Sequence, residues 1–393
     1  MTASATQNQI APADLSIKTI RSFRDFLDLE SVWNQVLERA ELCNPFLEHA
    51  WVRTWLECFG TESELHIVLV SAGDTPIAIA PLILTVVRMW GIKVRRLGFA
   101  YNAHVPRTDF IVARGRGDAY AAIWNHLRWN CNWDLLQLCQ LPETSATLEL
   151  SVLAAQDNCR IGLWESGASP YIVLHGGWTK YYEALAPKHR SNVRNRFKRL
   201  NERGTVEIET IESGTNVAQA LQEGLAIEAA AWKREAGTAI ISDQDISRFY
   251  VDFAQRAAER GWLRLNFLRA GPDRIAFDYS LLYRNRVFLL KLGYDPAFSP
   301  FSPSNLLLSL TLRNAFDQAC EGYDFLGEQA DWKQCWTKQS TSHFWLFIFA
   351  DSFKGRVLNL IKFRVIPVLR TERFRRLRSF ASRLAARVNR RRP

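Results

Sequence analysis

The sequence predicts an α/β protein of the α+β kind, made of two related halves and a basic helical tail. Each half is expected to hold a mixed, largely antiparallel sheet flanked by helices. The main observation is an order of elements (helices, three consecutive strands, a helix, a strand) that occurs clearly in the second half and faintly in the first. The length of 393 residues exceeds one ordinary domain and suits two. Internal duplication explains both observations.

The first half is predicted from runs of apolar residues with helical or alternating spacing. In chain order the expected elements are helices at 31–40 and 46–60, two strands within 65–87 joined by a Gly-Asp turn, a strand ending at Arg96, a short strand at 109–113, a helix at 117–128 and a strand at 134–140.

The second half begins near Pro170 and shows the same order more sharply. We expect a strand at 171–174, helices at 178–185 and 187–203, a strand at 205–211, helices at 216–233 and 245–260, three consecutive strands at 262–270, 274–283 and 287–295, a helix from Pro303, and late strands at 323–327 and 344–350. Ser302 is the expected N-cap of the helix that starts at Pro303.

Composition indicates a globular protein of the cytoplasm. Apolar residues make up 48% and charged residues 23%, which suits a packed core. Residues 1–14 are polar and lack the apolar segment of a signal peptide, so we expect them to be disordered. Seven scattered cysteines form no Cys-x-x-Cys pair and no Cys/His group with zinc spacing, so reduced thiols and no metal are expected. We place the domains at 15–168 and 169–351, followed by a basic tail at 352–393.

Charge is concentrated in two places. From Lys354 to the C-terminus there are 14 Lys and Arg residues and one acidic residue, so this tail has a net charge of +13. The net charge of the whole chain is +10, so the remaining residues together carry −3. A smaller concentration is the amphipathic helix expected at 187–203, where Arg190, Arg194 and Lys198 recur one turn apart. Such a line suits phosphates of CoA or of a nucleotide- or lipid-linked sugar. The alternative is a solvated basic face.

The start of the helix at Pro303 has a composition typical of an anion site. Its first turn is built from Ser302, Pro303, Ser304 and Asn305 and contains no acidic residue. Unpaired N–H groups and the positive end of the helix dipole attract phosphates without a charged side chain. An ordinary capped helix would explain the same residues.

Ionisable residues interrupt strands that are otherwise apolar. Asp278 and Lys291 lie on consecutive expected strands, and Asp324 opens a late strand. A buried acid and a buried lysine are costly unless they pair, so a cross-strand Asp278–Lys291 pair is expected, either structural or catalytic. Glu228 lies in the alanine-rich helix, four residues before Trp232.

Four blocks of the second half resemble a known family. The segments IEAAAWKREAGTAI (227–240), IAFDYSLL with LLKLGYDP (275–296), SPFSPSNLLL (299–308) and YDFLGEQADWKQCWT (323–337) are similar to the CelD/BioF-type acetyltransferases. These are tandem GNAT-fold proteins, related in fold to the FemAB peptidyltransferases. The first half matches only in outline, through FLEHAWVRTW, IAPLIL and RRLG. The family's Ser-Pro-Gly at the helix start is here Ser302-Pro303-Ser304.

The resemblance implies a site and its roles. Tandem GNAT-like domains would bind acyl-CoA, acetyl-CoA first among the choices, through Ser302, Pro303, Ser304 and Asn305. Acyl transfer needs a base for the acceptor's proton and groups that stabilise charge. The candidates for these roles are Asp278, Lys291, Asp324 and Lys333. The candidates for substrate binding are Arg190, Arg194, Glu228, Trp232, Trp332 and Trp336, of which Trp332 and Trp336 would wall a sugar or acyl site or belong to the core.

Three functions remain open at this point. The first is an acyl-CoA-dependent N- or O-acyltransferase acting on a sugar or amino-sugar of a cell-surface polysaccharide or its precursor. The second is a non-catalytic GNAT-fold accessory protein of polysaccharide or envelope biosynthesis, which Ser304 and the absence of a Q/R-x-x-G-x-G/A signature favour. The third is a FemAB-like transfer from aminoacyl-tRNA. The acceptor would be a sugar or lipid-linked sugar.

The tail is predicted to form two helical stretches separated by Pro367. In the second, an apolar stripe with steps of three and four residues is surrounded by arginines; the stripe is Phe374, Leu377, Ala381, Leu384 and Val388. This pattern is typical of a helix lying in an anionic membrane surface. A solubilising or RNA-binding tail is the alternative, although no specific nucleic acid is expected. The expected location is therefore the cytoplasm, with peripheral attachment at the inner face of the membrane.

Overall fold

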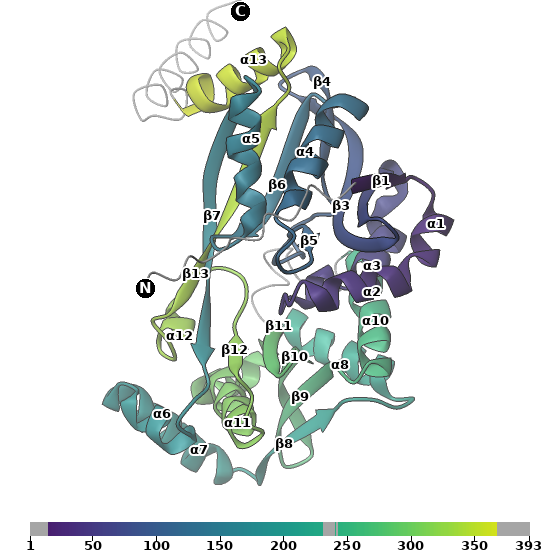
Figure 1. Cartoon of the computed structure of the whole chain (residues 1–393). Coiled ribbons are helices and arrows are strands. Elements are labelled where there is room, and N and C mark those ends of the chain that lie inside the picture. The colour runs from purple at the N-terminus through teal and green to yellow at the C-terminus, as the bar shows by residue number, and fades with distance from the viewer. Residues whose placement is uncertain (1–14, 231–239, 241–242, 368–393) are drawn as a thin grey trace, which may run out of the picture.

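The computed structural model describes residues 15–230, 240 and 243–367 of the chain. It confirms the predicted mixed α/β architecture, with a large, mostly antiparallel sheet system flanked by helices (Figure 1). The strands follow one another in the order β1-β2-β3-β4-β6-β13-β7-β12-β11-β10-β9-β8, and β5 pairs with β3. Only β4 with β6 and β11 with β12 pair in parallel; all other pairs are antiparallel.

The first half contains the elements that were expected and several that were not. Its strands are β1 (Leu15–Ile20), β2 (Glu64–Ala72), β3 (Thr75–Met89), β4 (Ile92–Phe99), β5 (Ile111–Val112) and β6 (Leu135–Pro142). Its helices are α1 (Phe23–Asp28), α2 (Glu30–Arg39), α3 (His49–Phe59), α4 (Asp118–Asn130) and α5 (Leu150–Gln156). The sequence did not predict β1, α1 or α5. Each is short, and β1 alternates partly exposed with exposed residues, so no apolar run marks it.

The second half follows the prediction closely. Its helices are α6 (Trp178–Ala184), α7 (Pro187–Asn201), α8 (Val217–Ala230), α10 (Gln244–Glu259), α11 (Pro303–Asp317), α12 (Asp331–Gln334) and α13 (Phe353–Leu360). Its strands are β7 (Arg160–Val173), β8 (Val206–Ile211), β9 (Leu263–Ala270), β10 (Asp273–Tyr283), β11 (Arg286–Tyr294), β12 (Gly322–Asp324) and β13 (Ser340–Phe349). The three consecutive strands β9, β10 and β11 are antiparallel neighbours, as expected.

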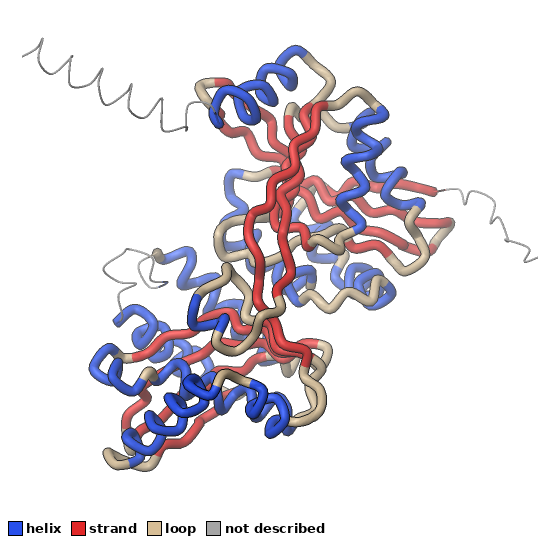
Figure 2. The backbone as a smooth tube through the Cα atoms, turned by 90° about the vertical axis from the view of Figure 1, so that its left-hand side faces the viewer, coloured by secondary structure: helices blue, strands red, loops and turns tan. Residues whose placement is uncertain are grey.

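Two long strands join the halves. β7 pairs with β13 from Arg160 to Pro170, and its last residues, Tyr171–Val173, pair with β12 of the second half. β13 lies between β6 and β7, so this late strand completes the sheet of the first half. Figure 2 shows the long strands crossing from one end of the molecule to the other. The sequence predicted only the end of β7, because Gly162, Gly167 and Pro170 give the remainder the composition of a loop.

The halves also share a hydrophobic core. Helix α3 packs on α10, where the Trp51 ring meets Phe249 and Phe253 edge-to-face with centroid distances of 5.0 and 4.6 Å. This cluster extends from Trp33 to residues of β9, β10 and β11. A second cluster lies between the first sheet and helices α4 and α5, and a third lies between the second sheet and helices α7 and α11. The shared cluster fixes the two halves against each other, since its core side chains are buried away from water.

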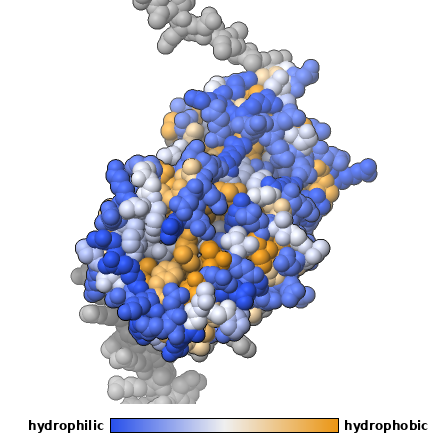
Figure 3. Space-filling view, turned by 90° about the horizontal axis from the view of Figure 1, so that it is seen from below, coloured by the Kyte–Doolittle hydropathy of each residue, from blue (hydrophilic) through white to orange (hydrophobic). Residues whose placement is uncertain are grey.

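The surface of the second half is unevenly apolar. Seen from below, hydrophobic residues gather near the centre of this face and hydrophilic residues ring them (Figure 3). Among the described helices, none is both long and apolar enough to cross a membrane. The chain after α13 forms a π-helical turn at Ile361–Val365, and the second tail stretch at 371–393 lies outside the described residues.

Candidate functional site

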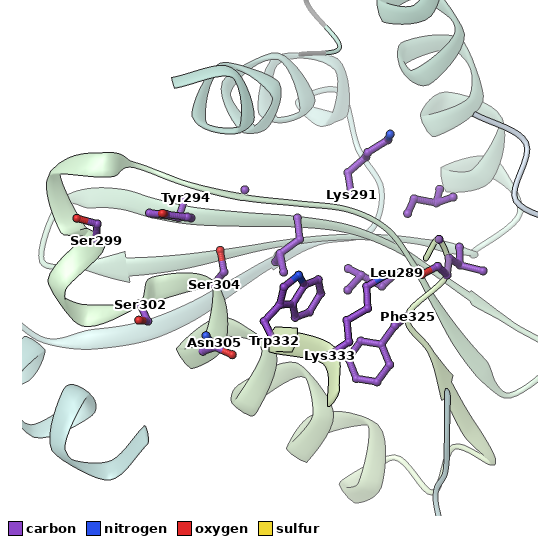
Figure 4. Close-up of a pocket in the computed structure, with 15 residues that line it drawn as sticks. Leu289, Lys291, Tyr294, Ser299, Ser302, Ser304, Asn305, Phe325, Trp332 and Lys333 are labelled. Carbon is purple, nitrogen blue, oxygen red and sulfur yellow. Dashed lines mark hydrogen bonds between the residues drawn. The ribbon is translucent and has the colours of Figure 1, made fainter. Parts of the chain in front are cut away.

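The candidate site lies where two parallel strands of the second half separate. β11 and β12 pair at only three positions, Arg286 with Gly322, Val287 with Tyr323 and Phe288 with Asp324. Beyond Phe288, β11 continues to Tyr294 with β10 as its only strand neighbour among the described residues. A pocket of about 510 Å³ lies along this open edge and is lined by residues 289–294 (Figure 4). This edge of β11 forms the first wall of the pocket.

The mouth of α11 forms a second wall of the pocket. The helix starts at Pro303 as predicted, and Ser302, Ser304 and Asn305 line the pocket (Figure 4). The backbone N–H groups of Asn305 and Leu306 both turn back to the Ser302 carbonyl, at 2.9 and 3.3 Å. The first turn contains no acidic residue. Pro303, also expected at the donor site, is buried and fixes the helix start.

Ser302 does not cap this helix in the expected way. Its backbone is left-handed, with φ 47° and ψ 60°, and its side chain makes no capping hydrogen bond. A capping serine adopts an extended backbone so that its hydroxyl can reach the first turn, and the left-handed conformation prevents this. The prediction of a side-chain cap was therefore wrong. The consequence is that the serine hydroxyl is not used up by the helix and faces the pocket.

The loop after β12 forms the third wall and carries Lys333. The Lys333 ammonium donates to the backbone carbonyls of Leu326 and Glu328, at 2.5 and 2.9 Å. Burial lowers the pKa of Lys333 to about 8, against the opposing charges of Asp324 and Glu328. Trp332 lines the pocket as expected. Trp336 is buried and supports the helix mouth, since its Nε1 donates to the Asn305 side-chain oxygen at 3.3 Å.

Lys291 and Asp278 lie on opposite faces of the sheet, so the expected cross-strand pair is wrong. The register places Lys291 opposite Tyr279 and Asp278 opposite Leu292. Because side chains alternate along a strand, neighbours opposite each other share a face and the two ionisable residues do not. Lys291 lines the pocket and lies over the Tyr250 ring, 4.9 Å from its centroid. Burial lowers the pKa of Lys291, and the charge of Glu228 opposes this.

Asp278 is fully enclosed in the core. It accepts hydrogen bonds from Asn266 Nδ2 and Ser280 Oγ, both at 2.8 Å, and its other oxygen has no partner among the described residues. Burial raises the pKa of Asp278 to about 7, although both hydrogen bonds favour the ionised form. The expected role as proton acceptor has no support from this position, since the side chain does not line the pocket.

Asp324 is bound to the first half of the chain. Its carboxylate pairs with the Arg107 guanidinium at 2.7 Å, and both side chains are almost completely buried. Arg107 Nε also donates to His343 Nε2 at 3.1 Å. Burial and the charge of Arg107 lower the pKa of His343 to about 4, so this imidazole is neutral at pH 7 and can accept. The sequence placed Asp324 in the site but gave no sign of its partner.

The remaining candidates are dispersed. Glu228 is buried on α8. The backbone of α8 packs so closely on β11 that a Cβ atom added to Gly293 would lie 2.6 Å from the Glu228 Cα. Arg190 donates to the Leu185 carbonyl at 3.1 Å, and Arg194 is exposed on α7. Trp232 lies outside the described residues.

The sequence analysis missed the contribution of the first half. A second pocket of about 310 Å³ shares Leu290, Lys291, Leu326 and Gly327 with the first one and is lined on its other side by the loop after β4. This loop includes His104. The signal in the sequence was the polar segment YNAHVPRTD (101–109), which follows a strand.

One group of potential metal ligands occurs elsewhere among the described residues. Ligand atoms of His66, His126 and Cys131 lie within 4.8 Å of one another, and His66 Nε2 is 2.8 Å from the cysteine sulfur. The spacing of these residues along the chain did not indicate such a group. Burial lowers the pKa of His66 and of His126, and the charge of nearby Arg21 acts in the same direction. Burial raises the pKa of Cys131 to about 11, against the charge of Arg21. The charge of Arg21 also opposes a bound cation.

Comparisons with known proteins agree with the geometry of the second half. Residues 187–334 match the family described as Acetyltransferase (GNAT) domain. This segment runs from the start of α7 to the end of α12 and includes all three walls of the larger pocket. A search of the curated proteins found no match.

Several solved structures share the fold of almost the whole chain. A crystal structure of FemX has a TM-score of 0.58 with 12% identity, over 88% of this chain and 99% of that chain. The C-terminal domain (DUF2156) of a putative lysylphosphatidylglycerol synthetase from Agrobacterium fabrum has a TM-score of 0.50 with 10% identity, over 86% and 97%. L-PGS from Bacillus licheniformis has a TM-score of 0.50 with 10% identity, over 86% and 96%. Identities this low show the fold alone.

Proposed function

We propose that the protein is an acyl-CoA-dependent N- or O-acyltransferase with acetyl-CoA as its donor, and the match of residues 187–334 to the Acetyltransferase (GNAT) domain family supports this. The proposed acceptor is a sugar or amino-sugar of a cell-surface polysaccharide or its precursor, as the CelD/BioF-type resemblance implies. The observation that supports the proposal best is the pocket between the diverging strands β11 and β12, closed at one end by a helix mouth without acids.

The pocket offers each part of an acyl-CoA a matching surface. Phosphates would lie at the first turn of α11, where the helix dipole favours negative charge and no acidic side chain opposes it. The amide-containing arm of CoA would run along residues 289–294, beside the edge of β11. The acyl group would then reach Lys291, at the junction with the second pocket.

Lys291 and Lys333 are the proposed charge-stabilising groups. Both line the pocket; Lys333 is buried and Lys291 is partly buried, and a cation removed from water stabilises a developing oxyanion more than it does in water. Asp324 is proposed to act as a positioning residue, because its carboxylate is already paired with Arg107. Its pairing would hold the loop that carries Lys333.

Calorimetric titration of the full-length protein with CoA and acetyl-CoA tests this proposal. We expect both to bind at one site, and we expect acetyl-CoA to release free thiol when a panel of amino-sugars is added. Failure of both ligands to bind would overturn the donor assignment. Binding without thiol release from any acceptor would favour the accessory-protein function instead.

A FemAB-like transfer from aminoacyl-tRNA is the second candidate. The basic helix α7 and the turn after it favour this candidate, since Arg199 of the helix and Arg203 of the turn lie over the Phe301 ring, 5.3 and 4.8 Å from its centroid. Phe301 directly precedes Ser302, at the start of α11. Guanidinium groups at this place would suit an RNA backbone. Discharge of aminoacyl-tRNA by the protein, with no use of acetyl-CoA, would select this candidate over the first.

We also propose peripheral attachment to anionic membranes through the tail, whose stretch 371–393 lies outside the described residues. The support is the arginine-rich sequence pattern, in which each basic residue near such a surface contributes about 1 kcal/mol before screening. Liposome flotation tests it. Binding to anionic but not neutral vesicles, lost on deleting 371–393 and weakened by salt, is expected. Full-length protein that stays at the bottom of the gradient with anionic vesicles would contradict it.

A further inference from the structure

The second pocket connects the donor site to the first half of the chain. It lies between the loop after β4, the start of β13 and the middle of β11, and it meets the larger pocket at Lys291 and Leu326. A molecule entering it would therefore approach the acyl group from the side opposite to the helix mouth. Acyl transfer requires two substrates that meet at one carbon, so a second pocket that opens onto the first has the place of an acceptor site.

His104 is the titratable group of the first half that is best placed in this pocket. A tight turn holds it, since the backbone N–H of His104 donates to Asn102 Oδ1 at 2.9 Å. Its Nδ1 lies 3.1 Å from the Tyr250 hydroxyl, and the rings are edge-to-face with centroids 5.7 Å apart. The same Tyr250 ring lies under the ammonium of Lys291. His104, Tyr250 and Lys291 thus form one cluster at the junction of the pockets, assembled from both halves.

We infer that the second pocket is the acceptor site and that His104 takes the proton of the attacking amine or hydroxyl. This inference rests on the proposed function and adds to it a catalytic residue from the half that does not bind the donor. With its proton on Nδ1, the imidazole donates to the Tyr250 hydroxyl oxygen and leaves the lone pair of Nε2 for the acceptor.

The proposed step is balanced as follows. The acceptor nitrogen or oxygen attacks the thioester carbon, a new C–N or C–O bond forms, and the C–S bond breaks. His104 Nε2 receives the proton that the attacking atom loses, and the CoA sulfur leaves with the electron pair of the broken bond and is protonated. The attacking atom becomes strongly acidic once the new bond forms, so a weakly basic imidazole suffices to take its proton.

The charges around His104 keep it neutral and able to accept. Burial and the charge of Lys291 lower its pKa to about 4, and the charge of Asp243 at the N-cap of α10 opposes them. Tyr250, the other titratable group in contact, has its pKa raised by burial and stays uncharged. The histidine is therefore unprotonated throughout the neutral pH range.

The pocket lining indicates the class of acceptor. Its wall presents hydroxyl, amide and carboxylate groups on one side, from Ser166, Ser169, Gln140 and Glu328. Tyr101, Val105 and Pro106 supply apolar surface on the other. Such a surface suits a small amine or alcohol that carries further hydroxyl groups, or one sugar unit of a larger molecule.

Affinity labelling tests the inference without an identified acceptor. Bromoacetyl-CoA carries a reactive CH2 carbon beside the position of the thioester carbonyl, and the full-length protein would be incubated with it and digested for mass spectrometry. We expect one label per chain, on His104, formed as Nε2 displaces bromide from that carbon. Excess CoA should prevent labelling, and His104→Gln should abolish it. The matched control His175→Gln, at an exposed histidine after β7, should leave it unchanged.

The outcomes separate this inference from the proposed function. Binding of CoA with the label on Lys291, on any other residue or on none would overturn the role of His104 and leave the donor site standing. Failure of CoA itself to bind, measured separately by calorimetry, would overturn the proposed function first.

Discussion

The two halves of the chain contain the same diverging pair of parallel strands, and the openings of the two pairs differ in what occupies them. β4 and β6 pair at three positions, and so do β11 and β12. In the first half the chain itself occupies part of the opening: Thr108 donates from its backbone to the Gln140 carbonyl and from its hydroxyl to the Cys139 carbonyl. A pocket of about 350 Å³ remains there, lined by Gly98 of β4 and Gln137 of β6. In the second half the corresponding edge of β11 lines the larger pocket.

The helices α4 and α11 also differ, in the charge of their first turns. The first turn of α4 contains Asp118, which pairs with Arg116, whereas the first turn of α11 contains no acid. The strand pattern alone therefore does not make a donor site in this fold. In the proposed function, the segment that enters the opening and the charge of one helical turn would decide which half binds the anionic donor.

The largest expected effect comes from giving α11 the charge that α4 already has. Ser304→Asp places a carboxylate at the helix mouth, where it would repel the phosphates of CoA. We expect CoA binding to fall below detection in calorimetry, with an unchanged melting temperature. Asp118→Asn is the control in the first half and should leave CoA affinity as it is. Unchanged affinity in Ser304→Asp would place the donor site elsewhere.

The second effect concerns the contact that fixes one half to the other. Arg107→Met leaves Asp324 buried without its partner, and the loss of one member of a buried pair costs about 3–5 kcal/mol. We expect a large drop in melting temperature and in the denaturant midpoint, and Arg107→Lys should recover part of it. A variant as stable as the wild type would show that the ion pair contributes little to the joining of the halves.

The third effect uses one buried carboxyl from each half. Burial raises the pKa of Asp278 to about 7 and that of Asp109 to about 6, from an ordinary value of 3.8. Between pH 4 and these values the folded state holds more protons than the unfolded state, so the free energy of unfolding falls as pH rises. Asp278→Asn should remove a fall on the order of 4 kcal/mol.

Asp109→Asn should remove a smaller fall in the free energy of unfolding with rising pH. The reason is that Ser145, Thr147 and the Phe110 N–H already donate hydrogen bonds to the Asp109 carboxylate. Melting temperatures at pH 4.5 and 7.5 measure both slopes. Equal slopes for wild type and the two variants would show that neither carboxyl is held protonated.

The smallest expected effect concerns Lys333, whose ammonium group lies at the opening between β11 and β12. The loop after β12 brings Lys333 into the pocket, whereas the loop after β6 begins with Glu143. Since the pKa of Lys333 is about 8, CoA affinity should fall by up to about tenfold between pH 7 and pH 9 as the ammonium loses its proton. Lys333→Arg, titrated with CoA at the same pH values, should show a smaller fall in affinity. An equal fall in the wild type and the variant would assign the pH dependence to another group.

The sequence predicted those elements whose signal is local. The amphipathic spacing in α7 and α10, the three apolar strands β9 to β11 and the Ser-Pro start of α11 each lie within a short window. The acid-free helix mouth and Lys333 were found for the same reason. The Asp278–Lys291 pair was not predictable, because one residue of register decides which face a side chain occupies.

Contacts between distant parts of the chain left no local signal. Arg107 with Asp324 and His104 with Tyr250 join residues from different halves, and nothing in either segment indicates the partner. The position of β13 was hidden in the same way, since its apolar run fits either sheet.

The return of β13 to the first sheet has a consequence for the synthesis of the chain. About 200 residues separate the end of β6 from the start of β13, so on a ribosome β6 emerges long before its neighbour exists. At about 5–20 residues per second this leaves an unpaired strand edge for about 10–40 seconds. The first half is thus the first to be made and the last to be finished, and a gene cut between the halves would yield a fragment with a permanently exposed edge.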